Sequence, residues 1–86
     1  MPIISRFFGI TISMFHNEHA PPHFHAEYGE EEELIEILTL DVYRGRLPRR
    51  VHRIFLEWAD EHREELMANW LAARAKKPLS NIDPLK

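Results

Sequence analysis

Four of the six histidines lie within one short stretch, residues 16–28, which has the sequence HNEHAPPHFHAEY. Imidazole exchanges protons near neutral pH and is the commonest metal ligand, so we expect any chemistry to be located here. His23 and His25 are separated by one residue, and side chains so spaced on a strand point to the same face. We therefore take His23 and His25 as the first candidates for catalytic proton transfer, and His16 and His19 as the second.

Three interpretations of these histidines stay open. In the first, they exchange protons with an RNA substrate or contact it. In the second, they are simply polar residues on the solvent-facing side of a half-buried strand. In the third interpretation they hold a divalent metal ion, with His23 and His25 joined by either His19 or Glu27. The chain has no cysteine, so a metal site would need His, Asp or Glu ligands. No other cofactor is expected.

A group of arginines surrounds the expected start of a helix and is the second candidate site. Guanidinium binds phosphate through two parallel hydrogen bonds, and a helix N-terminus favours anions, so these side chains predict phosphate or RNA contacts. The alternative is that they neutralise the acidic run at residues 30–33. That run otherwise reads as a solvated hairpin turn, or as a carboxylate cluster for a metal. The arginines are Arg44, Arg46, Arg49, Arg50 and Arg53.

The histidines and arginines must be positioned by strands and a helix that the apolar pattern predicts. Alternating apolar residues predict strands over residues 1–8, 10–15, 23–28 and 34–39, while residues 40–46 form a short fifth strand or an irregular connection. Pro21 and Pro22 predict a loop before the third strand. On that strand we expect Phe24, Ala26 and Tyr28 to face the core. His23, His25 and Glu27 should then face solvent.

Apolar residues then recur every three or four positions from Val51 to Ala73, which predicts an amphipathic helix from Pro48 to about Arg74. An unbroken helix of that length would be roughly 40 Å long and would overhang so small a sheet. We therefore expect a break near Asp60 or a protruding end. Two tryptophans should anchor the core, and His62 should be a packing residue. The tryptophans are Trp58 and Trp70.

Together these elements predict an α+β fold. A four- to five-stranded, mainly antiparallel meander should be followed by a long C-terminal helix packed on one face. We expect a single domain over residues 1–77 and an extended tail over residues 78–86. A domain of 86 residues has little stability to spare, so a homodimer or another partner would help it.

Composition excludes several classes of protein. Hydrophobic residues make up 44% and charged residues 29%, as in ordinary globular proteins. No apolar run reaches the length of a membrane span, so we expect a cytoplasmic protein with no membrane partner. Motifs for serine hydrolases, P-loops and dinucleotide binding are absent from the sequence. The net charge of −3 argues against a protein that coats nucleic acid. Its distribution argues against this less strongly, because residues 1–47 carry −5 and residues 48–86 carry +2.

Four segments occur in a characteristic order: PIISRFFGI, PPHFHAEYG, LPRR and LEWADEHREELMANW. In these segments the chain resembles the bacterial family of small proteins known as domain of unknown function 4160, from Pro2 to about Leu85. The resemblance implies a protein from a compact two-gene module of the toxin–antitoxin kind, with a protein partner encoded by the neighbouring gene. It supplies no catalytic residues.

Three functions therefore remain. The first is a component of such a module that acts on or binds RNA, and whether it is an enzyme is undecided. The second is a non-enzymatic protein-binding adaptor, the antitoxin half. The third is a small metal-binding protein that uses the histidines.

Overall fold

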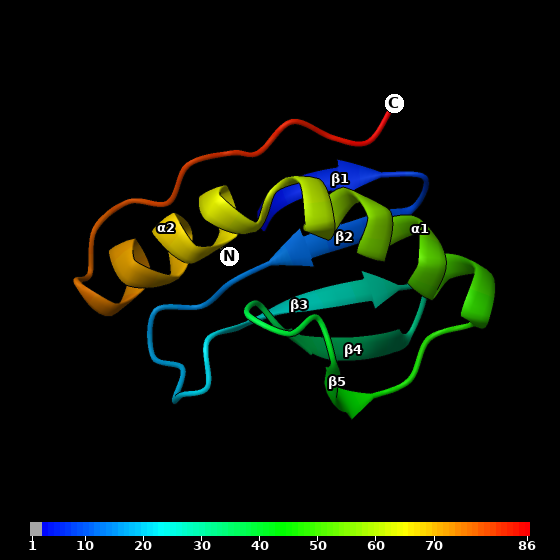
Figure 1. Cartoon of the computed structure of the whole chain (residues 1–86), viewed down its shortest axis with the longest axis horizontal. Coiled ribbons are helices and arrows are strands. Elements are labelled where there is room, and N and C mark those ends of the chain that lie inside the picture. The colour runs from blue at the N-terminus through cyan, green and yellow to red at the C-terminus, as the bar shows by residue number, and fades with distance from the viewer. Residues whose placement is uncertain (1–2) are drawn as a thin grey trace.

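The computed structural model describes residues 3–86, which form a five-stranded antiparallel sheet followed by two helices (Figure 1). The strands follow one another in the sheet in the same order as in the sequence, which confirms the predicted α+β meander. Met1 and Pro2, which we placed in the first strand, lie outside the described residues. The strands are β1 (Ile3–Phe7), β2 (Ile10–Ser13), β3 (His23–Tyr28), β4 (Glu31–Glu36) and β5 (Val42–Gly45), and the helices are α1 (Arg49–Glu61) and α2 (Arg63–Arg74).

We expected the acidic run at residues 30–33 to form a turn. This expectation is wrong, because most of the run belongs to β4. The turn between β3 and β4 is only two residues long, and its first residue, Gly29, has a φ of +62°. Because the turn is so short, Tyr28 pairs with Glu31, and the acidic residues that follow pair with β3 as part of β4. Their side chains consequently alternate between the two faces of the sheet. Glu33 lies opposite Ala26, and Glu32 lies opposite Glu27.

Both helices pack on one face of the sheet (Figure 1). Phe24 of β3 contacts Phe55 and Trp58 of α1 edge to face, with ring centroids 6.3 and 6.4 Å apart. Trp58 and Trp70 are both buried, as the apolar pattern predicted. The main residues of this core are Ile10, Ile12, Phe24, Ala26, Ile35, Val51, Phe55, Trp58 and Leu66.

The C-terminal helix is broken at His62, close to Asp60, where we expected a break if the helix did not protrude. α1 ends at Glu61 and α2 begins at Arg63, while His62 between them has φ −120° and ψ 24°. The His62 ring packs 5.3 Å from Trp58, and its Nδ1 lies 2.5 Å from Glu65 Oε1. His62 is therefore a hydrogen-bonded packing residue, as we expected.

β5 is a short edge strand with a bulge. Leu34 pairs with Arg44 and Ile35 pairs with Val42, so Tyr43 is an extra residue between the two pairs. Gly45 has a φ of +85°, and a Cβ there would lie 2.2 Å from the carbonyl oxygen of Glu32. Only glycine fits this close approach without strain. The bulge turns Tyr43 toward β3, where its ring centroid lies 5.4 Å from that of His23.

The segment after α2 is extended and returns across the helices to β1 (Figure 1). Ile82 is buried, and its backbone N–H donates a 2.8 Å hydrogen bond to the carbonyl of Ile4. Trp58 Nε1 donates to the carbonyl of Asp83 at 2.7 Å. Both ends of the Asn69 side-chain amide bond the backbone of Ser80. The tail thus covers the β1 edge of the sheet.

Candidate functional site

The alternation predicted for β3 is partly correct. Phe24 and Ala26 are fully buried under the helices, and His23 and His25 lie close together, with ring centroids 5.5 Å apart. The expectation that both imidazoles face solvent is wrong for His23, which is only 2% exposed. The rings of Tyr43 and Trp70 lie 5.4 and 5.3 Å from it and exclude water.

The two histidines are oriented by hydrogen bonds to their Nδ1 atoms. His23 Nδ1 lies 2.7 Å from the carbonyl oxygen of Pro21, and His25 Nδ1 lies 2.9 Å from Glu32 Oε2. Both partners can only accept a hydrogen bond, so each Nδ1 carries a proton. In the neutral rings, the two Nε2 atoms are therefore left with lone pairs.

Glu18 meets both of these Nε2 atoms. It lies in the loop between β2 and β3, and its Oε2 is 3.5 Å from His23 Nε2 while its Oε1 contacts His25 Nε2. Ligand atoms from the three residues all lie within 4.8 Å of one another. His23 Nε2 is buried and has no hydrogen-bond partner among the residues that the structure describes. Two nitrogen lone pairs and a carboxylate thus lie close together, and such a group of atoms can bind a cation.

Aromatic rings enclose this group. The Phe15 ring lies edge-on to His25, with centroids 4.7 Å apart, and Tyr43 and Trp70 flank His23. The side chains of His25 and Glu18 remain 12% and 24% exposed, so a small ion can enter from the solvent side. The group is thus sheltered by aromatic rings but remains partly exposed at His25 and Glu18.

The other histidines named from the sequence do not join this group. His19 is exposed, and His16 Nε2 lies 3.2 Å from the carbonyl oxygen of Lys77 at the end of α2. Glu27 is half-buried and pairs with Thr11 and Glu32 in the sheet, outside the converging ligands. The third member of the group is Glu18, a residue that the sequence did not single out. In the sequence, only its position between His16 and His19 suggests that Glu18 belongs to this group.

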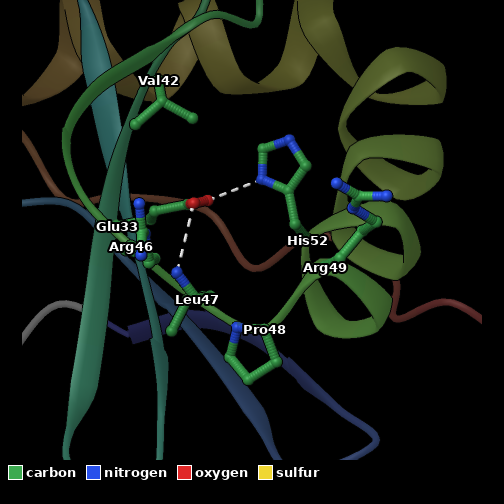
Figure 2. A pocket seen from close by; sticks show the side chains of 7 residues that line it. All are labelled: Glu33, Val42, Arg46, Leu47, Pro48, Arg49 and His52. Carbon is green, nitrogen blue, oxygen red and sulfur yellow. Dashed lines mark hydrogen bonds and ion pairs between the residues drawn. The ribbon is translucent and has the colours of Figure 1, made fainter.

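The arginines are divided between the two faces of the sheet. Arg44 pairs with Leu34, which pairs with His25, so these three side chains share the face that carries the histidines. Arg46 and Arg49 instead line a pocket on the other face, beside Glu33 and His52 (Figure 2). Arg50 and Arg53 are exposed on α1.

The expected pairing of these arginines with the acidic run is not seen. Within residues 3–86, none of the five arginines forms an ion pair with residues 30–33. Glu33 is 4% exposed and instead accepts hydrogen bonds from His52 Nδ1 at 2.7 Å and from the backbone N–H of Leu47 at 3.2 Å. The sequence analysis missed His52, whose spacing on α1 gives no sign of this buried partner.

Comparison with known proteins gives one match. The family model for domain of unknown function (DUF4160) matches residues 9–71, well over half of the chain. The chain belongs to this family. No curated protein and no solved structure matches the sequence or the fold. Among the described residues of this DUF4160 protein, no helix is long and apolar enough to cross a membrane.

Proposed function

We propose that this DUF4160 protein binds a divalent transition-metal ion through Glu18, His23 and His25. The observation that carries the proposal is His23 Nε2, which lies 3.5 Å from the Glu18 carboxylate. This nitrogen is buried and has no hydrogen-bond partner within residues 3–86. A buried lone pair left without a donor is costly, and a metal ion would satisfy it.

The surroundings of the two imidazoles support this function. Histidines that bind metals usually donate their other ring N–H to a carbonyl or carboxylate, which fixes the tautomer and the ring orientation. His23 does this with the Pro21 carbonyl, and His25 does it with Glu32. Both rings therefore present Nε2 to the same point, where the carboxylate of Glu18 completes a set of three ligands.

The chemistry of the ligands selects a class of metal. Two imidazole nitrogens with one carboxylate suit Zn²⁺, Fe²⁺, Ni²⁺ or Co²⁺, whereas Mg²⁺ and Ca²⁺ prefer all-oxygen sites. Around a tetrahedral ion with bonds of about 2.0–2.1 Å, ligand atoms lie about 3.4 Å apart. The ligand atoms lie within 4.8 Å of one another, so the widest separation would contract by up to about 1.4 Å around such an ion. Three protein ligands leave at least one coordination position for water or a substrate.

A proton is the competing cation. His25 could instead be an imidazolium held between Glu18 and Glu32, with both ring nitrogens donating. That arrangement would still leave the buried His23 Nε2 without a donor, because Glu18 offers it only carboxylate oxygens. A metal ion satisfies both histidines at once, so we prefer it.

The experiment is a titration of tag-free, metal-stripped protein with Zn²⁺ and Co²⁺ at neutral pH, followed by calorimetry and by cobalt absorption. We expect one ion per chain. Both His23→Ala and Glu18→Ala should weaken binding by more than the roughly 10–100-fold that the loss of an outer hydrogen bond costs. His19→Ala is the matched control, because it removes an imidazole from the same loop outside the ligand group, and it should bind normally. The absence of binding by the unmodified protein, or an equal loss in His19→Ala, would overturn the proposal.

The metal ion also bears on the RNA-directed role expected for a two-gene module of the toxin–antitoxin kind. Glu18 and Glu32 flank the histidines, and without a cation their charges would repel phosphate. We propose that any action on RNA at this site depends on the bound metal. Growth arrest on expression in a bacterial host that is lost in both His25→Ala and Glu18→Ala would support this role. Growth arrest that persists in both variants would count against this role. The alternative, a non-enzymatic adaptor, is tested separately by co-purification with the neighbouring gene product.

A further inference from the structure

A second site lies on the opposite face of the sheet, where the loop before α1 crosses β4. It is an open pocket of about 540 Å³ between β4, β5 and the first turn of α1 (Figure 2). Ala26 pairs with Glu33 while the adjacent His25 pairs with Leu34, so Glu33 and the histidine group point to opposite faces. The pocket is thus separate from the proposed metal site.

Glu33 organises this pocket. Its buried carboxylate bonds the N–H of Leu47 and the Nδ1 of His52, as the dashed lines in Figure 2 show. These two contacts fix the loop and the imidazole ring at the same time. Each carboxylate oxygen of Glu33 accepts one of these hydrogen bonds. His52 Nε2 lies on the far side of the ring from Glu33 (Figure 2).

The walls of the pocket are basic. Arg46 from the loop and Arg49 from α1 line it, and neither forms an ion pair within residues 3–86. The first turn of α1 contains no acidic residue, and Pro48 supplies no side-chain cap. Two guanidinium groups beside the single carboxylate of Glu33 give the pocket a net positive charge. Both arginines are exposed, so their guanidinium groups are accessible to an anion that enters the pocket.

We propose that this pocket binds the phosphate group of a ligand, with Arg46 and Arg49 as its main donors. Planar guanidinium groups match the geometry of phosphate oxygens and hold them through paired hydrogen bonds. Val42 and Pro48 add apolar walls beside these donors, which suits a sugar or base attached to the phosphate. The phosphate belongs either to a nucleic acid strand or to a free nucleotide or phosphate ion.

The experiment compares Arg49→Ala with Arg50→Ala. The two variants remove the same charge from the same helical turn, and both side chains are exposed, but only Arg49 lines the pocket. Inorganic phosphate, AMP and a labelled single-stranded RNA are titrated separately, with NMR shifts of the Leu47 amide and fluorescence anisotropy as readouts. Arg49→Ala and Arg46→Ala should each weaken binding about 10-fold or more, whereas Arg50→Ala should change it less than about 3-fold.

The three probes distinguish the sources of the phosphate. Binding of RNA alone that depends on Arg46 and Arg49 indicates a strand, and binding of AMP or phosphate indicates a small ligand. Either result supports the proposal. Equal losses in Arg49→Ala and Arg50→Ala would indicate diffuse surface attraction and overturn it, as would failure of all three probes to bind. Addition of a chelator to the unmodified protein should leave the binding of inorganic phosphate and AMP unchanged, which separates this pocket from the metal site.

Discussion

Glu32 Oε2 lies 2.9 Å from His25 Nδ1, on the side of the imidazole ring away from Glu18. Glu32 is therefore an outer partner that turns His25 Nε2 toward the proposed metal ion. Partners of this kind also make the ring a stronger ligand.

The first prediction concerns this outer contact. Glu32→Ala should lower zinc affinity by about 10–100-fold, less than the loss caused by His25→Ala. Glu31→Ala is the control, because it removes an adjacent exposed carboxylate that has no contact with the histidines among the described residues. Calorimetry on the three variants measures the effect. Equal affinities for Glu32→Ala and the unmodified protein would show that Glu32 does not orient the ring.

The second prediction is that metal binding stabilises the fold. An ion that binds only the folded chain, at a free concentration of 100 times its Kd, adds about 2.7 kcal/mol to the free energy of unfolding. In a domain of this size that gain raises Tm by roughly 10 °C or more. Thermal unfolding with and without zinc tests it. A chelator should reverse the gain, and His23→Ala should show none of it.

The third prediction concerns the bulge of β5 that brings Tyr43 against His23. Gly45→Ala should destabilise the protein strongly, because its Cβ would lie 2.2 Å from the carbonyl oxygen of Glu32. Gly29→Ala is the matched control: its φ is also positive, at +62°, but a Cβ there meets nothing within 4 Å. Gly29→Ala should lower the free energy of unfolding by only about 1 kcal/mol, through backbone strain. Urea unfolding should show a clearly larger loss for Gly45→Ala, and similar losses would mean that the strand can shift.

The fourth prediction concerns the C-terminal tail. Ile82 is 3% exposed, and Ile82→Ala should lower the free energy of unfolding by about 2–5 kcal/mol. Asp83→Ala is the control, because its side chain is exposed and its carbonyl bond to Trp58 survives the change. Urea unfolding measures both. A loss below about 1 kcal/mol for Ile82→Ala would show that the tail separates easily and is free to dock elsewhere.

The elements of the fold followed from local patterns. Alternating apolar residues located β3 at residues 23–28, and the three- to four-residue spacing located the helical region. Helix length predicted either a break near Asp60 or a protruding end, and the structure has a break at His62. These features depend on periodicity and chain geometry within one segment, so a single sequence carries them. Local patterns did not predict how long the turn before β4 is, because acidic residues suit a turn and an edge of a sheet equally well.

The sequence by itself determined which residue types are available: two histidines on one face of β3, acids nearby, and no cysteine. Only the tertiary structure decided which of them meet. It buried His23 under Tyr43 and Trp70, brought Glu18 back from the loop, and placed Arg46 and Arg49 on the face away from the histidines. The physical reason is that these contacts join segments far apart in the chain. Strand register, the β5 bulge and helix docking set such contacts, and no local pattern encodes them.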